Sequence, residues 1–203
     1  MYTSIDKTTI AEGCLSTLEN SEDPIHRRLS LVVLRLAGDE RDDHMDMLFN
    51  AAEKVLKEDP AAIVRQLAAW VLRDFPAHRA LNTLTSGLAD KDWEVRFEVV
   101  ESLASLASIW DYYHGHDDDE YEDDNDDNDD NDDEKNVKKG EEKEVIDDGS
   151  HYVKSAITGL LMALRDNRPE VSLRAAFHLS SLNPCKVRSE IKKMIPECTE
   201  ASS

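Results

Sequence analysis

The sequence predicts an all-α protein, a solenoid in which about four helical hairpins stack side by side. A segment of fourteen residues recurs along the chain, and the stretches between its copies carry apolar residues at helical spacing. The copies begin 38, 31 and 76 residues apart, and two helices with their turns fill roughly 31 to 40 residues. No stretch shows the alternation of apolar and polar residues that is typical of a β-strand.

The recurring segment has the same pattern in three places, which begin at Asp59, Asp90 and Asp166. Valine stands five residues after each aspartate, a small or β-branched residue nine after it, and leucine thirteen after it. A weaker copy begins at Ser21 and keeps an arginine, Arg27, where two of the other copies have one. The period predicts these core residues: Val64, Ala68, Leu72, Val95, Leu103, Val171, Ala175 and Leu179.

The stretches between the copies are predicted to form the partner helices of the hairpins. Residues 42–56, 78–88 and 151–164 each place apolar side chains on one helical face, as does a shorter stripe near the N-terminus. Residues 186–194 are predicted to open a further repeat. The stripes consist of Ile10, Cys14 and Leu18; Met45, Leu48, Phe49, Ala52 and Leu56; Ala80, Leu81, Leu84 and Leu88; and Val153, Ile157, Leu160, Leu161 and Leu164.

Negative charge is concentrated in one segment. The chain has 44 acidic and 24 basic side chains, a net charge of -20, and residues 117–150 alone contribute 19 acidic residues against 4 lysines. Such a segment buries too little apolar surface to offset its chain entropy. We therefore expect repeats over residues 1–113, a disordered acidic insertion over 114–150, and the final repeat, the start of a further helix and a flexible tail over 151–203.

The composition also excludes several kinds of protein. Clustered Lys and Arg, which phosphate binding needs, are scarce, and this charge pattern argues against a general nucleic-acid binder. No apolar run approaches the ~20 residues that span a bilayer, and the first residues lack the features of a signal peptide, so we expect no membrane partner. Cys14, Cys185 and Cys198 are too scattered for a disulfide scaffold or a zinc cluster, which favours a reducing compartment.

The pattern Asp-x-x-x-x-Val-Arg, which begins at Asp59 and again at Asp90, resembles the repeat of the HEAT family. The resemblance implies units of helix, turn and helix, with the aspartate in the turn and the arginine on the second helix. It also implies that aspartates and arginines of neighbouring units bond to one another and hold the stack. On this resemblance the fold is a HEAT-like α-solenoid, and its inter-repeat structural ladder consists of Asp59, Arg65, Asp90 and Arg96.

A second resemblance covers residues 51–182 and is to the C-terminal part of the BRCA-associated ATM activator family, the BRAT family. It depends on three stretches in matching order and spacing: residues 70–74 (Trp-Val-Leu-Arg-Asp), 92–96 (Asp-Trp-Glu-Val-Arg) and 163–169 (Ala-Leu-Arg-Asp-Asn-Arg-Pro). It implies a non-enzymatic partner of ATM-type kinases and of Integrator subunits in the DNA damage response, in nucleus and cytoplasm. It implies no particular binding residue.

We therefore predict a scaffold without catalytic activity or cofactor, which binds other proteins through an extended surface of stacked helices. One alternative is an enzyme on the same fold, such as a lyase or a metal-dependent hydroxylase. Hydroxylases of this kind bind iron through His-Glu pairs, and none of the seven histidines here is followed by Glu. His114, His116 and the aspartates after them are suitable metal ligands, but a solvated stretch with weak, unspecific metal uptake explains them as well.

A third alternative is weak nucleic-acid binding through the last helix, which carries Lys186, Arg188, Lys192 and Lys193. A solvated helix face is the simpler interpretation of these four residues. The acidic insertion also has two interpretations, a solubilising loop or a mimic of nucleic acid that occupies a basic groove on a partner.

The aromatic residues divide into two groups by position. Trp70 and Trp93 fall in the apolar stripes of the recurring segment, and we expect both in the core. Trp110, Tyr112 and Tyr113 lead into the acidic insertion, where they would form an exposed contact patch.

Overall fold

The computed structural model describes residues 7–37, 44–114 and 150–194, and within these ranges it has nine helices and no strand. The predicted acidic insertion and tail fall on residues 115–149 and 195–203, outside the described part. The helices are α1 (Lys7–Asn20), α2 (Pro24–Ala37), α3 (His44–Glu58), α4 (Ala62–Leu72), α5 (Ala77–Gly87), α6 (Trp93–His114), α7 (Ser150–Ala163), α8 (Pro169–Ser181) and α9 (Pro184–Met194).

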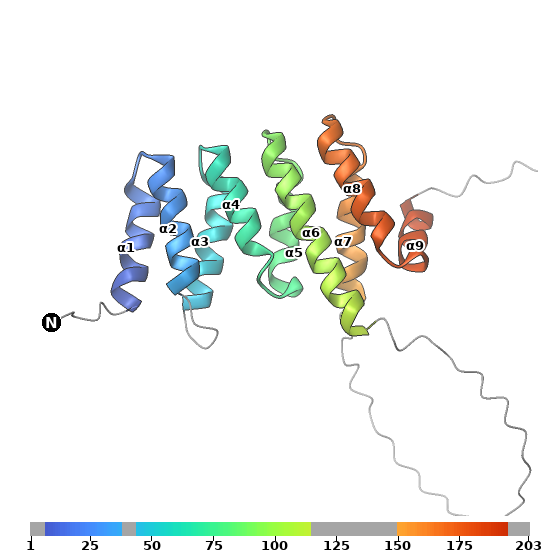
Figure 1. Cartoon of the computed structure of the whole chain (residues 1–203), viewed down its shortest axis with the longest axis horizontal. Coiled ribbons are helices and arrows are strands. Elements are labelled where there is room, and N and C mark those ends of the chain that lie inside the picture. Colours follow the sequence, from blue (N-terminus) through green and yellow to red (C-terminus); the bar gives the residue numbers. More distant parts are fainter. Residues whose placement is uncertain (1–6, 38–43, 115–149, 195–203) are drawn as a thin grey trace, which may run out of the picture.

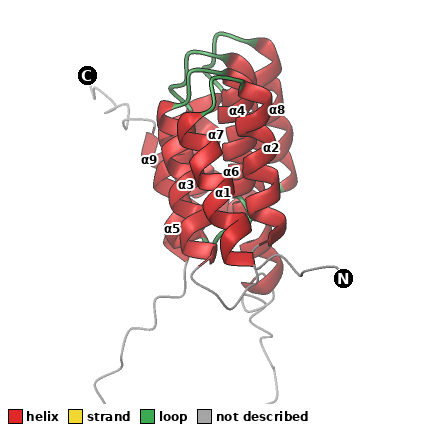
Figure 2. Ribbon diagram, turned by 90° about the vertical axis from the view of Figure 1, so that its left-hand side faces the viewer, coloured by secondary structure: helices red, strands yellow, loops and turns green. Residues whose placement is uncertain are grey.

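The helices are arranged in two layers. Four hairpins, α1–α2, α3–α4, α5–α6 and α7–α8, stand side by side along the molecule, and α9 follows the last (Figure 1). The odd-numbered helices form one layer and the even-numbered helices the other. In a view along the stack, α5 and α9 of the odd-numbered layer lie on one side, and α2 and α8 of the even-numbered layer lie on the other (Figure 2). This arrangement confirms the predicted α-solenoid of about four hairpins.

Prolines and short polar side chains set where several helices begin. Pro24, Pro169 and Pro184 are the first residues of α2, α8 and α9, where the missing backbone N–H has no partner to lose. The Asp23 carboxylate accepts a hydrogen bond from the backbone N–H of Ile25 at 2.8 Å, which satisfies a donor that the first turn of α2 leaves open. These signals separate the two helices of a hairpin by a tight turn.

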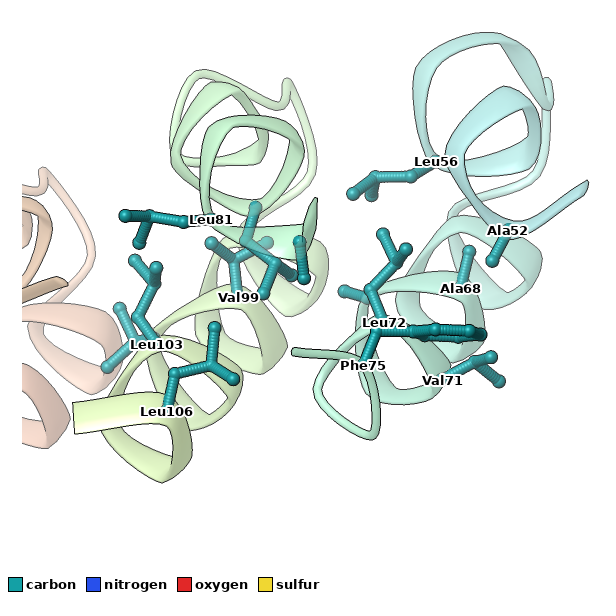
Figure 3. Packing of buried hydrophobic residues seen from close by; sticks show 14 of the residues in the cluster. Ala52, Leu56, Ala68, Val71, Leu72, Phe75, Leu81, Val99, Leu103 and Leu106 are labelled. Atoms are coloured by element: carbon teal, nitrogen blue, oxygen red, sulfur yellow. The ribbon is translucent and has the colours of Figure 1, made fainter. Parts of the chain in front are cut away.

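The core lies between the layers and continues from one hairpin to the next. All eight core residues predicted from the recurring segment are buried. Leu56 of α3, Leu72 of α4 and Val99 of α6 point into the space between neighbouring hairpins (Figure 3). Leu72 and Val99 have no exposed area, and complete burial of a leucine contributes about 1.5–3 kcal/mol.

The predicted apolar stripes are less accurate at their ends: Ile10 and Leu18 are half-buried, as is Leu88, which follows the last residue of α5. We predicted Leu164 on the helical face of residues 151–164, but α7 ends at Ala163 and the Leu164 side chain lies in the following turn, 40% exposed. The helix expected from residue 42 is described from His44 onward, and Met45 is half-buried rather than in the core. Leu164 lies beyond the end of its helix and leaves the face that the helix interior buries, whereas Met45, one residue after the buried His44, packs against the edge of the core.

The solenoid continues across the segment that separates α6 from α7. α6 extends to His114 and α7 begins at Ser150, one residue beyond each expected boundary of the insertion. The two helices pack against each other, and α8 packs against both. The third and fourth hairpins are therefore neighbours in space in the same way as the others.

Candidate functional site

A row of buried ion pairs joins the four hairpins at the end where each hairpin turns. In each pair an arginine near the start of an even-numbered helix donates two hydrogen bonds, 2.6–2.9 Å long, to both carboxylate oxygens of an aspartate in the next hairpin's turn. The six side chains are 4–10% exposed. We call this row the ladder, and its pairs are Arg27–Asp59, Arg65–Asp90 and Arg96–Asp166.

The middle pair of the ladder shows how each arginine is held. Arg65 uses Nε and Nη2 for Asp90, Nη1 for the backbone carbonyl of Asp59 at 2.8 Å, and Nη2 again for Asp92 at 2.5 Å. Asp90 Oδ1 in turn accepts the backbone N–H of Asp92. One guanidinium thus ties the turn of its own hairpin to the turn of the next.

The electrostatics of the ladder follow from these bonds. Burial raises the pKa of the Asp90 carboxyl, but the hydrogen bonds from Arg65 and from the Asp92 N–H outweigh it, so this pKa lies below its ordinary value. The hydrogen bond from Arg96 likewise lowers the pKa of Asp166, against the opposing effect of burial. The ladder is therefore charged at neutral pH and internally satisfied, and it has no free group for a ligand.

All four predicted ladder residues take part in the ladder, but Arg65 and Asp90 are the two among them whose side chains pair with each other. Arg65 pairs with Asp90, whereas Asp59 pairs with Arg27, and Arg96 pairs with Asp166. The sequence prediction did not include Arg27 and Asp166, although both occupy the matching positions in the first and last copies of the recurring segment. The last copy has serine in place of the arginine, so it contributes only its aspartate.

Large apolar side chains are exposed mainly on one layer of the solenoid. Among the described residues, seven of the ten exposed large hydrophobic side chains lie on even-numbered helices. We call the exposed side of α2, α4, α6 and α8 the even-helix face. Its exposed apolar side chains are Ile25, Leu29, Val33 and Leu36 on α2, Ile63 on α4, and Leu173 and Phe177 on α8.

Trp70 of α4 lies between two arginines rather than within the core. The guanidinium carbon of Arg35 from α2 lies 4.3 Å from the centre of the indole, and that of Arg73 lies 4.8 Å away. Arg35 also donates to the Asp74 carboxylate at 2.7 Å. The prediction of a core Trp70 is thus met only in part, because the ring packs against the core but is half-buried and forms cation–π contacts. 

Trp93, which was also expected in the core, is half-buried with the guanidinium carbon of Arg168 4.9 Å from its centre. Trp110, Tyr112 and Tyr113 belong to the last turns of α6, whose side chains lie outside the described part of the chain. The predicted contact patch therefore stays a prediction.

A second polar and aromatic group lies where α6 meets α8. Glu101 accepts a hydrogen bond from Arg174 Nε, and its carboxylate lies 3.3 Å from His178 Nε2. Burial raises the pKa of Glu101, but the neighbouring Arg174 and His178 outweigh it and hold this pKa below the ordinary value. The Arg174 guanidinium also lies near the rings of Phe97 and Phe177, at 5.8 and 5.2 Å.

Other reactive groups give no indication of catalysis over the residues that the structure describes. No group of three or more His, Cys, Asp or Glu there is arranged to hold a metal ion. Burial raises the pKa of the Cys14 thiol, which disfavours the reactive thiolate. The candidate ligand His116 and the aspartates after it lie outside the described residues.

The basic residues of the last helix are only partly free. In α9, Lys193 donates to Glu190 at 2.7 Å and Lys186 is half-buried, whereas Arg188 and Lys192 are exposed. None of the nine helices described is both long and apolar enough to cross a membrane.

Comparisons with known proteins agree with this geometry. No curated protein matches the chain. Residues 49–109, which comprise most of α3, all of α4 and α5 and most of α6, match the family model of HEAT repeats. This match supports the HEAT-repeat family, and the four stacked hairpins form an all-α, HEAT-like solenoid.

Proposed function

We propose that this chain is a non-enzymatic scaffold that binds other proteins through its even-helix face. The observation that carries the proposal is the concentration of exposed leucine, isoleucine and phenylalanine side chains on that layer. Four of these side chains lie together on α2 and two on α8, and groups of exposed apolar side chains are typical of protein–protein interfaces. HEAT repeats commonly serve as protein-interaction scaffolds, which is consistent with this assignment.

The resemblance to the BRAT family supports a more specific partner. We propose an ATM-type kinase or an Integrator subunit, bound in the DNA damage response in nucleus and cytoplasm. Two of the three stretches that carry the resemblance, residues 70–74 and 92–96, lie on α4 and α6 or in the turns beside them. Trp70 and its two arginines offer the amphipathic, rigid contacts that are enriched at binding hot spots.

Affinity capture from nuclear and cytosolic extracts, analysed by mass spectrometry, tests this proposal. The test variant is Leu173→Ser/Phe177→Ser, which removes side chains that are 70% and 58% exposed on α8. The matched control is Met162→Ser/Ile191→Ser, which removes exposed apolar side chains of α7 and α9 in the other layer. We expect the wild-type chain and the control to recover the same partners and the α8 variant to lose them.

Two outcomes contradict the proposal at different levels. Recovery of neither an ATM-type kinase nor an Integrator subunit refutes the specific partner and leaves the scaffold assignment. A third form, in which residues 117–149 are replaced by an uncharged Gly/Ser chain of equal length, addresses the acidic segment. Loss of partners only in this form moves the contact from the even-helix face to that segment.

A further inference from the structure

The odd-numbered layer contains a groove between its first two helices. α1 packs closely on α2 but only slightly on α3, and the space between α1 and α3 has a volume of about 780 Å³. This volume is within the ~300–1,000 Å³ of typical ligand pockets. Apolar side chains from both helices line it: Leu15, Leu18, Met47, Ala51 and Val55.

The groove is closed at one end by the first pair of the ladder. Arg27 and Asp59 line this end together with Pro60. Arg27 is committed to Asp59 and to the backbone carbonyls of Ser21 and Glu22, so its charge is neutralised in place. This end is therefore rigid, and the ladder offers a ligand neither a free cation nor a free anion.

The groove is negatively charged at its closed end. Glu19, Glu22 and Glu58 line it, and the only other cation in the lining besides Arg27 is Lys54. With Asp59, the lining holds four carboxylates against two cations, so its net charge is negative.

A weak salt bridge spans the groove and can yield to a ligand. Lys54 of α3 donates to Glu19 of α1 at 3.1 Å, and the two side chains are 59% and 61% exposed. Pairs this exposed contribute little to stability. A ligand cation can therefore replace the Lys54 ammonium on Glu19 at little cost to the fold.

We propose that the groove between α1 and α3 binds a segment of a partner protein that carries aliphatic side chains next to arginine or lysine. The aliphatic side chains of the partner segment pack on Leu15, Leu18 and Met47, and its arginine or lysine lies among the three glutamates. The net negative charge of the lining excludes phosphate-bearing ligands such as nucleic acids. This proposal deepens the scaffold function and rests on it, but it uses the layer opposite to the even-helix face.

Fluorescence anisotropy with a defined probe tests the proposal on the full chain. The probe is a fluorescein-labelled peptide with the core Leu-Lys-Lys-Leu-Leu-Lys, and its two relatives have every leucine replaced by serine or every lysine by glutamate. We expect saturable binding in the micromolar range for the probe alone. No saturable binding, or equal binding of the serine peptide, overturns the proposal.

Variants locate the site of binding. Glu22→Gln/Glu58→Gln removes two exposed carboxylates of the groove and leaves no buried group unpaired, and it should weaken binding by about tenfold or more. The matched control, Glu94→Gln/Glu170→Gln, makes the same charge change on α6 and α8 and should bind within about twofold of wild type. Equal weakening in both overturns the proposal, because it shows attraction to the net charge of -20 rather than to the groove.

Two further measurements separate this proposal from the scaffold function. If the α8 variant Leu173→Ser/Phe177→Ser loses its captured partners while the probe fails to bind, the scaffold function stands and the groove proposal fails. Light scattering after size exclusion detects a second copy as occupant. If the chain self-associates and the variant Glu22→Gln/Glu58→Gln does not, the groove binds another copy of this chain. That result overturns the proposal that a segment of a different protein binds there.

Discussion

Replacement of Arg65 by methionine tests whether the ladder holds the second and third hairpins together. Methionine keeps the aliphatic stem, so packing changes little and the lost contacts are those of the guanidinium. The Asp90 side chain, 9% exposed, would then retain only the Asp92 N–H as a hydrogen-bond donor. Loss of one partner of a buried pair costs about 3–5 kcal/mol, a large share of a typical folding free energy of about 5–15 kcal/mol.

Two further variants show whether the loss comes from the stranded carboxylate. In Arg65→Met/Asp90→Asn no uncompensated charge remains, and the asparagine Oδ1 can still accept the Asp92 N–H. We expect this double variant to regain at least about half of the stability lost in the single one. Lys54→Met removes the exposed Lys54–Glu19 pair and should cost less than about 1 kcal/mol.

The effect of Arg65→Met should also depend on pH. The pKa of Asp90 in the folded chain lies below its ordinary value of 3.8, despite burial, because of the bonds from Arg65 and the Asp92 N–H. A carboxyl with a lowered pKa stabilises the fold above the pKa of the unfolded chain, and this contribution is lost as pH falls through the folded-state pKa. The stability difference between wild type and variant should therefore be full at pH 7 and smaller in acid.

The stability of each variant is measured by urea unfolding, which is monitored by far-ultraviolet circular dichroism and by tryptophan fluorescence. Trp93 follows Asp92 directly in the chain, so fluorescence reports on the region of the pair. A loss below about 1 kcal/mol for Arg65→Met, no larger than that of Lys54→Met, would refute the argument. So would a double variant that is no more stable than the single one.

Two other predictions concern packing and a half-buried carboxyl. Gly87→Ala should destabilise the chain by about 1–3 kcal/mol, because an added Cβ would lie 2.7 Å from Val99 Cγ2 in the core. Gly13→Ala, where an added Cβ would meet nothing within 4 Å, should instead stabilise α1 by roughly 0.5–1 kcal/mol. Urea unfolding should therefore show a lower midpoint for Gly87→Ala and a higher midpoint for Gly13→Ala than for the wild type. Glu98→Gln should raise the melting temperature at pH 7, because burial raises the pKa of Glu98 and the ionised form is therefore less stable in the fold. Melts well below the ordinary pKa of 4.5, where the carboxyl is protonated in both states, should show no such gain.

Much of the fold could be predicted because its core repeats a local pattern. The valine and leucine of the recurring segment are five and thirteen residues after the aspartate, and both face inward in the three copies that begin with aspartate. This follows from the helical period alone and needs no knowledge of the neighbouring hairpin. The prediction was wrong where a residue's environment depends on where the helix ends, as for Leu164, because periodicity does not give the last turn.

The pairing within the ladder could be predicted only in part. The partners of its three pairs are 32, 25 and 70 residues apart in sequence, although all three pairs have the same geometry. The separation varies because α2 and α3 are longer than α4 and α5, and because a long segment separates α6 from α7. Residue types therefore indicate which side chains take part, but the stack determines which arginine meets which aspartate.

The even-helix face could not be recognised from hydrophobicity, and α2 shows why. It has leucines on two sides: Leu31 and Leu34 are fully or almost fully buried, whereas Leu29 and Leu36 are 55% and 72% exposed. Both pairs fit a helical stripe, so the sequence pattern alone does not tell which stripe faces the core.

The ladder resolves this ambiguity in α2. Arg27 must face the next hairpin to reach Asp59, and Leu31 and Leu34 follow it at four and seven residues, on the same side of the helix. Leu29 and Leu36 must then point away from the core. The orientation of a helix with two apolar stripes thus follows from one charged residue whose partner is known, and the exposed stripe left over is the part available for binding.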